Sequence, residues 1–281
     1  MSMEFWQQVL SFATLTAQRV GEELLQQFGQ VSAVEKQDGS LVTHWDRWSD
    51  DYIRTAISST FPHHGLLSEE SDHCFPNQDW VWIIDPLDGT TNFAMGVPLW
   101  AISFGLFYQG TPVFGYVHVP PLSQSFHGFW GGTSGLTMPT GSFLNGQLLH
   151  TKDTLVTDNH LFSFCTRSIC SLQQTWGRDR TFPCKIRMFG VATYNMLTVS
   201  TGSTLGAVEA TPKIWDIGAV WSILHGAGAT WIHLNHHPIF PLLPGVDYGN
   251  VSFPSLVLAH PNLTPIFLPW VDPVTTQPMA T

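Results

Sequence analysis

The amino-acid sequence predicts a layered α/β fold. Segments with helical periodicity and segments with strand periodicity follow one another in mixed order, as they do where helices pack against sheets. The chain has 281 residues, of which 43% are hydrophobic, so it can bury a large core and is not a disordered chain. We therefore expect one compact unit built from two intimately packed halves, residues 1–150 and 151–281.

The first half opens with an amphipathic helix over residues 3–28, where Phe5, Val9 and Leu24 recur at helical intervals. Gly and Pro separate later β-rich runs, which indicates an antiparallel meander before a Gly-rich loop that closes on the Asn145–Gly146 turn. The expected segments are an extended stretch at 40–43, a helix at 46–59, a short strand at 65–67, a buried strand at 81–84, meander strands at 101–108, 113–119 and 124–130, and the loop at 131–147.

The second half alternates between strands and helices. The expected strands are 161–165, 185–189, 205–210, 229–234 and 256–259, and the expected helices are 191–201 and 216–226. Residues 261–270 form an apolar tail interrupted by proline, which is less regular than a final helix.

Charge and composition exclude several functional classes. The net charge is −10 with only 11 Lys and Arg, which argues against a nucleic-acid partner. No apolar run reaches the length of a membrane span, and the N-terminal segment lacks the pattern of a secretory signal. Four cysteines without metal-binding spacing indicate buried or free thiols in a reducing compartment: Cys74, Cys165, Cys170 and Cys184. These features favour the cytoplasm and no membrane partner.

Residues 80–98 carry the segment around which the site is expected, WVWIIDPLDGTTNFAMGVP. The strand at 81–84 delivers Asp85 and Asp88 to its end, and Pro86 holds Asp85 in an extended conformation. Gly89 permits close approach of a ligand, and the residues from Thr90 onward suit a helix start that favours phosphate. Carboxylates beside free amides predict a metal-assisted phosphate site. The alternative is an ordinary Asp-Gly turn.

The segment DPLDGTTNF at 85–93 resembles the signature D-P-[IL]-D-G-T-x-N-F of the inositol monophosphatase family, magnesium-dependent and lithium-sensitive sugar-phosphate phosphatases. Three further segments resemble that family in the same order: KQDGSLVTHWD at 36–46, LLSEES at 66–71 and IWDIGAVWSILHGAGA at 214–229. The resemblance implies the α-β-α-β-α sandwich of the inositol monophosphatase and fructose-1,6-bisphosphatase type.

The resemblance also implies the metal ligands. It assigns a first Mg²⁺ to Glu69, Asp85 and the Leu87 carbonyl, and a second to Asp85, Asp88 and Asp216. A third, weaker site near Glu69 is usual among relatives, so two or three Mg²⁺ ions are expected. Hard oxygen donors of this kind suit Mg²⁺, and converging carboxylates would repel one another without cations. Asp216 also precedes a helical segment, so it has the alternative or additional role of a helix cap.

The same resemblance assigns the catalytic roles. Thr90 and Asp46 would relay a proton from the attacking water, with Glu69 beside them at the metal. On spacing alone, Asp46 is equally a capping acid. The amides of Gly89 and Thr90 would hold phosphate oxygens. Lys36 corresponds to a lysine often found near the metals, or is a solvated loop residue.

Substrate recognition is expected in the second half. Glu209 lies where inositol phosphatases carry a glutamate that accepts hydrogen bonds from ring hydroxyls. Gly190 and Ala192 match small residues of the same pocket, although Gly190 also suits a strand-to-helix turn. With Asp88, Gly89, Thr90 and Asp216, these residues form the expected substrate site. A zinc site at His233, His236 and His237 is disfavoured, because no Cys or Glu stands at ligand spacing.

Together these features predict a Mg²⁺-dependent phosphomonoesterase for a small polyol phosphate, with myo-inositol 1-phosphate as the first choice. Histidinol phosphate or another sugar phosphate is an alternative within the superfamily. A regulatory binding protein that keeps the fold without turnover is an alternative of another class. By resemblance we expect lithium sensitivity and a homodimer, which agrees with a tryptophan-rich chain of low charge.

Overall fold

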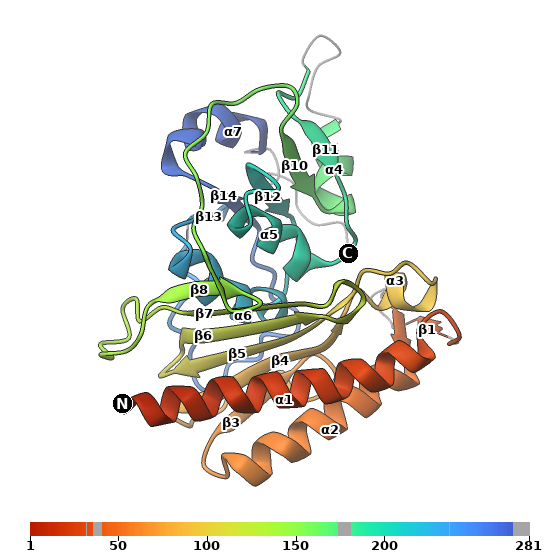
Figure 1. The fold of residues 1–281 in the computed structure, drawn as a ribbon, viewed down its shortest axis with the longest axis vertical. Coiled ribbons are helices and arrows are strands. Elements are labelled where there is room, and N and C mark those ends of the chain that lie inside the picture. Colours follow the sequence, from red (N-terminus) through yellow and green to blue (C-terminus); the bar gives the residue numbers. More distant parts are fainter. Residues whose placement is uncertain (32, 36–40, 174–180, 236, 272–281) are drawn as a thin grey trace.

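The computed structural model of the chain describes residues 1–31, 33–35, 41–173, 181–235 and 237–271. Its largest element is a seven-stranded sheet (Figure 1). The strands of this sheet, in spatial order, are β3 (Gly65–Ser68), β4 (Trp80–Asp88), β5 (Ala101–Tyr108), β6 (Thr111–Val119), β7 (Gln124–Phe129), β8 (Gly141–Leu144) and β9 (Gln147–Leu149). The edge strand β3 runs parallel to β4, and the other neighbours are antiparallel. The predicted meander is therefore confirmed.

A second, five-stranded sheet is built from the second half of the chain (Figure 1). Its strands, in spatial order, are β11 (Lys185–Arg187), β10 (Leu161–Phe164), β12 (Gly206–Glu209), β14 (Ser255–Leu258) and β13 (Thr230–His233). β10 is parallel to β11 and β12, whereas β14 is antiparallel to its neighbours. A small antiparallel pair, β1 (Ala33–Glu35) and β2 (Leu41–Thr43), leads into the second helix.

Helices separate and cover the two sheets (Figure 1). α1 and α2 lie on the outer face of the seven-stranded sheet, and α5 and α6 lie between the sheets. The helices of the described chain are α1 (Met3–Gln27), α2 (His44–Thr60), α3 (Thr90–Ala94), α4 (Thr166–Gln173), α5 (Ala192–Ser200), α6 (Ile214–Gly226) and α7 (Thr264–Val271), with short 3-10 turns at Pro120–Leu122 and Pro261–Leu263.

Successive side chains of β10 point to opposite faces of the smaller sheet, and their contacts show which helix covers each face. The hydroxyl of Ser163 donates to the Asn195 carbonyl of α5 at 3.0 Å. Phe162 and Phe164 point the other way, and the Phe162 ring lies 4.7 Å from that of Phe267 in α7. Crossovers between parallel strands are right-handed as a rule, and β10-α4-β11 and β11-α5-β12 run in opposite directions along the sheet, so α4 is expected on the face opposite α5, which is the α7 side. This arrangement confirms the layered α/β fold with five layers.

A row of glycines brings α6 against the larger sheet. Gly105, Gly115 and Gly128 are paired side by side across β5, β6 and β7. A Cβ atom at Gly115 would lie 1.8 Å from the Ala219 carbonyl oxygen, and one at Gly128 would lie 2.6 Å from the Ile223 Cα. Only glycine permits so close an approach of helix backbone to strand backbone. The first turn of α6 is thereby placed beside the end of β4.

Some elements differ from the sequence expectations. The helix expected at 46–59 begins at His44, because Thr43 caps it. The loop expected at 131–147 contains β8, although the Asn145–Gly146 turn is confirmed by the β8–β9 pairing. The tail expected to be irregular is a helix, α7. Pro269 removes only one hydrogen bond near its end, and Phe267 and Val271 are buried, Phe267 against Phe162 of β10. The helix α4 was not expected.

Other expectations have partial outcomes. The predicted boundary near residue 150 falls between β9 and β10. The helix α6 contacts strands of both sheets, and the division into two halves stays a prediction. Cys74, Cys165 and Cys184 are free thiols, and the Cys170 side chain lies outside the described residues. Among the described helices, none combines the length and apolar character that crossing a bilayer demands.

Candidate active site

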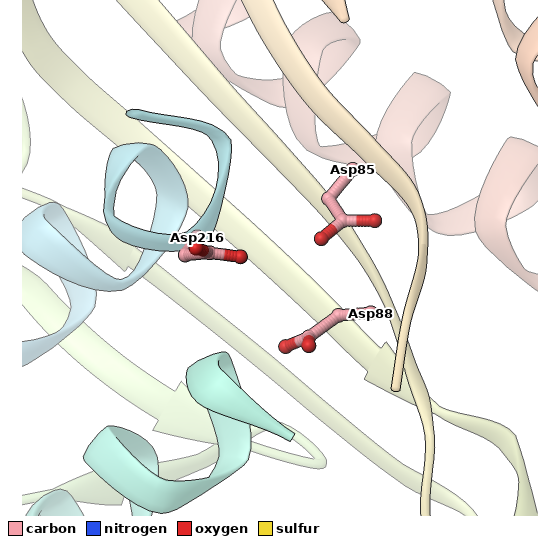
Figure 2. Close-up of side chains that lie close together, drawn as sticks. All are labelled: Asp85, Asp88 and Asp216. Atoms are coloured by element: carbon pink, nitrogen blue, oxygen red, sulfur yellow. The ribbon is translucent and has the colours of Figure 1, made fainter. Parts of the chain in front are cut away.

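Two of the expected carboxylates, Asp85 and Asp88, stand at the end of β4. Residues three apart in a regular strand point to opposite faces of the sheet. Here the pairing of β4 with β5 shifts register between Asp85 and Asp88, and Figure 2 shows both carboxylates on the side that faces α6. The Leu87 amide donates to Asp85 Oδ1 at 3.0 Å, which orients that carboxylate. The irregular strand end therefore places both acids at one site.

The third carboxylate, Asp216, comes from the first turn of α6. Its Oδ2 accepts a hydrogen bond from the Lys213 amide at 2.6 Å, so Asp216 caps the helix from its third position. Each of Asp85, Asp88 and Asp216 offers a carboxylate oxygen, and these oxygens lie within 4.8 Å of one another (Figure 2). Capping occupies one oxygen of Asp216, which leaves the other to face the acids of β4.

Electrostatics make this cluster costly without positive charge. Burial raises the pKa of the Asp85 carboxyl well above its usual range, and the charges of Glu69, Asp88 and Asp216 raise this pKa further. Burial, followed by the charge of Asp88, likewise raises the pKa of Asp216. Such a cluster of hard oxygen donors fits a divalent cation, which would remove both the repulsion and the desolvation penalty.

Asp88 is held by the second half of the chain. Its Oδ1 accepts from the Ala192 amide at 3.2 Å, and its Oδ2 accepts from the amide and hydroxyl of Thr193 at 2.7 and 2.5 Å. Burial raises the pKa of Asp88, while these hydrogen bonds lower it. The start of α5 thus fixes the orientation of a carboxylate that belongs to β4.

A cavity of about 440 Å³ opens over these acids. Its lining includes Glu69 at the end of β3, together with Leu87, Gly89 and Thr90. The His73 ring nitrogen Nε2 lies 2.8 Å from the carbonyl oxygen of Glu69. The structure therefore brings the expected metal and phosphate residues to one cavity. Lys36, the remaining residue expected there, lies outside the described residues.

Thr90 and Asp46 are in direct contact. The Thr90 hydroxyl donates to Asp46 Oδ1 at 2.8 Å and also lies 3.1 Å from the Leu87 carbonyl oxygen. Asp46 is 1% exposed, and its Oδ2 accepts from the amide and hydroxyl of Thr43 at 2.7 and 2.6 Å. Asp46 is thus both a capping residue of α2 and the partner of Thr90. The two alternatives for Asp46 are compatible.

Gly89 is the N-cap of the short helix α3, and its backbone lies in the left-handed region, with φ of 93°. A Cβ atom there would lie 2.7 Å from Cγ2 of Val191. The residue is therefore glycine for both its backbone conformation and its contact with the start of α5. Gly89 and Thr90 both form part of the cavity wall.

The expected substrate residues line an adjoining cavity of about 350 Å³ that shares Asp88 and Asp216 with the first. Gly190, Ala192 and Glu209 all belong to its wall. Glu209 Oε1 accepts from the Asn195 side-chain amide at 2.6 Å. Burial raises the pKa of Glu209 to about 8, so near pH 7 its carboxyl is largely protonated and can also donate a hydrogen bond.

Three residues that hold the functional groups were not anticipated: Thr43, Thr193 and Asn195. The first had a visible signal, since a threonine followed three residues later by an acid is a capping-box pattern, here Thr43 and Asp46. Thr193 and Asn195 have no such signal, because they lie in α5 and their partners, Asp88 and Glu209, lie in β4 and β12. Of the three histidines considered for zinc, His233 Nδ1 lies 2.5 Å from the His237 carbonyl oxygen, and His236 lies outside the described residues.

Comparison with known proteins agrees with this geometry. The family model described as "Inositol monophosphatase family" matches residues 6–263. A fructose-1,6-bisphosphatase/inositol-1-monophosphatase of Aquifex aeolicus is 30% identical over 237 residues, which are 82% of this chain and 87% of that protein. A histidinol-phosphatase of Chlorobaculum parvum is 29% identical over 228 residues, covering 78% and 83%.

Solved structures show the same likeness. The structure of an IMPase from Thermotoga maritima superposes with a TM-score of 0.77 at 26% identity, covering 94% of this chain and 97% of that one. Since the family model spans all but the ends of the chain, this protein belongs to the inositol monophosphatase family.

Proposed function

We propose that this protein is a Mg²⁺-dependent phosphomonoesterase that hydrolyses a small polyol phosphate, with myo-inositol 1-phosphate as the preferred substrate. The observation that carries the proposal is the convergence of three carboxylates, Asp85, Asp88 and Asp216, beside the hydrogen-bonded pair of Thr90 and Asp46. Family membership supports a phosphatase, while the relatives differ in the substrates that their names give.

The donor set fits two or three Mg²⁺ ions. Glu69, Asp85 and the Leu87 carbonyl would hold the first ion, and Asp85, Asp88 and Asp216 the second, with a weaker third site near Glu69. When bound, Mg²⁺ supplies an acidified water and neutralises charge on the phosphoryl group. Support comes from the burial of these carboxylates and from their mutual repulsion.

The protein groups then perform two tasks. The Thr90 hydroxyl can accept a proton from the attacking water while it passes its own proton to Asp46 Oδ1, 2.8 Å away. The Gly89 and Thr90 amides would hold phosphate oxygens through the in-line displacement. Thr43 keeps Asp46 in the orientation that this transfer requires, because both of its bonds go to the other carboxylate oxygen.

The adjoining cavity would hold the part of the substrate beyond the phosphate. Gly190 and Ala192 leave room there, and Glu209 offers hydrogen bonds to adjacent hydroxyl groups. Inositol presents such hydroxyls around its ring. Histidinol phosphate is the second candidate, because Glu209 in its ionised form, beside Asp88 and Asp216, also suits an ammonium group.

Phosphate release from a substrate panel with and without Mg²⁺ tests the proposal. We expect the highest kcat/KM on inositol 1-phosphate, with histidinol phosphate, fructose 1,6-bisphosphate and an aryl phosphate as comparisons. A clear preference for histidinol phosphate would show that the protein is a histidinol-phosphate phosphatase. No phosphate release from any substrate would favour a regulatory binding protein instead.

Three further properties belong to this proposal. Lithium inhibits the enzyme at millimolar concentration, the protein is a homodimer, and it acts in the cytoplasm. The low charge and the many aromatic residues support an apolar interface between subunits. Light scattering at micromolar concentration tests the dimer, and a monomer would contradict it. Full activity in millimolar lithium would weaken the assignment to the inositol branch.

A further inference from the structure

The helix α2 carries a second buried acid, Asp50, one turn after Asp46. Asp50 is only 4% exposed. Its Oδ1 accepts the hydroxyl proton of Ser68 at 2.5 Å, and its Oδ2 lies 3.5 Å from Nε of Arg54. Ser68 is the last residue of β3 and is fully buried. Burying a carboxylate carries a desolvation penalty, which contacts such as these two must offset.

These contacts hold the backbone on both sides of Glu69. Ser68, just before Glu69, is bound to Asp50, and the hydroxyl of Ser71, two residues after it, accepts from the Arg54 guanidinium. The segment needs such support, because β3 is an edge strand and, among the described residues, pairs only with β4. An edge strand has ladder hydrogen bonds on one side alone, so its end is held less firmly than that of a central strand.

We propose that Asp50 is a positioning residue for the metal site. Through Ser68, and with Arg54 on Ser71, it fixes the segment that presents Glu69 to the cavity. The same helix orients Asp46, so α2 sets the position of the proton acceptor and of a metal ligand relative to one another. This inference rests on the proposed role of Glu69 in holding Mg²⁺. Nothing in the proposed reaction requires Asp50 to touch substrate.

Calorimetric titration of Mg²⁺ into the protein without substrate tests the inference. Loss of a group that orients a metal ligand weakens metal affinity about 10- to 100-fold, which is the result expected for Asp50→Ala. Asp50→Asn keeps an oxygen that can accept from Ser68 and should recover most of that affinity. Glu23→Ala is the matched control, because Glu23 forms an i,i+4 ion pair with Arg19 on α1, as Asp50 does with Arg54 on α2.

A double-variant comparison shows whether Asp50 acts through Glu69. Groups that act in one chain of contacts are not additive. Asp50→Ala combined with Glu69→Gln should therefore bind Mg²⁺ no more weakly than Glu69→Gln alone. Thermal unfolding in EDTA checks that each variant is folded, and Ser68→Ala replaces Asp50→Ala if the latter is not.

Two results would overturn the inference: wild-type Mg²⁺ affinity in the folded variant, or a loss that adds in full to that of Glu69→Gln. A purely structural acid would lower the unfolding temperature in EDTA and leave Mg²⁺ affinity unchanged. Unchanged affinity in Glu69→Gln itself would be a different failure, since it would remove the proposed metal role of Glu69 and the inference with it.

Discussion

Thr90 donates its hydroxyl proton to Asp46 across 2.8 Å, although the two residues open different helices and stand 44 positions apart. The second oxygen of Asp46 is occupied by Thr43, so the first is directed toward Thr90. Thr90 also belongs to the wall of the acidic cavity, whereas Asp46 is buried behind it. The pair forms a hydrogen-bonded path from the cavity to an interior carboxylate.

This path predicts that Thr90→Val and Asp46→Asn each lower kcat by about 100-fold or more, the range of a lost general base. Mg²⁺ affinity should change much less, because neither side chain belongs to the expected metal ligands. Steady-state kinetics and Mg²⁺ titration measure the two effects separately. If Asp46→Asn kept full activity across the pH range, Asp46 would serve only to cap α2.

The carboxylate cluster predicts strict metal dependence. EDTA should abolish activity and added Mg²⁺ should restore it. Asp88→Asn should lower kcat/KM by about 100-fold or more, because one pre-placed charge is lost from the site. Asp72→Asn is a suitable control, since Asp72 is an exposed acid that accepts a hydrogen bond from the Cys74 amide. Undiminished turnover by Asp88→Asn in metal-free buffer would contradict the proposed metal-dependent mechanism.

Glu209 predicts a substrate effect that depends on pH. Its pKa is raised to about 8, so the carboxyl is mostly neutral at pH 6.5 and mostly ionised at pH 9. Gln resembles the neutral acid, so Glu209→Gln should change KM for inositol 1-phosphate little at pH 6.5. At pH 9 it should raise KM about tenfold, the value of one hydrogen bond to a charged group.

An aryl phosphate without hydroxyl groups is the control for Glu209, and its KM should not respond to the substitution. Equal losses on both substrates at both pH values would place Glu209 in the scaffold. A loss confined to histidinol phosphate would support that substrate instead.

His225 predicts acid sensitivity of the fold. Its ring stacks on Trp130 at 4.3 Å, and burial lowers its pKa from 6.5 to about 4. Between these values the unfolded chain binds a proton that the folded chain does not. The stability contributed by neutral His225 is therefore present above pH 6.5 and is lost as pH falls toward 4. The loss at pH 5 is about 2 kcal/mol of unfolding free energy.

His225→Phe keeps an aromatic ring in the stack and removes the titration. Denaturant unfolding at pH 7.5 and pH 5 should show a smaller drop in unfolding free energy for this variant than for the wild type. His260→Phe is the control, because His260 lies on the surface near Asp153. An equal drop in the His225 variant and the wild type would show that His225 does not carry this sensitivity.

Much of the fold followed from local patterns. The amphipathic periodicity of residues 3–28 predicted α1 to within a residue of its observed end, and the Gly and Pro breaks predicted β5, β6 and β7. The three prolines of residues 261–270 predict an irregular tail, whereas the structure has a helix there, because packing into the core buries Phe267 and Val271. The helix α2 begins two residues before the predicted start at 46, because Thr43 caps it.

Local sequence alone determines the groups at the end of β4. Asp85, Pro86, Asp88 and Gly89 are neighbours in the chain, so their backbone preferences and chemistry can be read together. The starts of α2 and α6 are also set by local contacts, since Asp46 and Asp216 each accept a hydrogen bond from the backbone amide three residues earlier.

Tertiary structure decides how these groups meet. Asp216 reaches the acids of β4 because three glycines from separate strands let α6 approach the sheet. Asp88 is oriented by Thr193, which lies 105 residues away, and the segment of Glu69 is held by Asp50 across 18 residues. Such contacts depend on the packing of whole layers, and no local pattern records which strand or helix will become the neighbour of another.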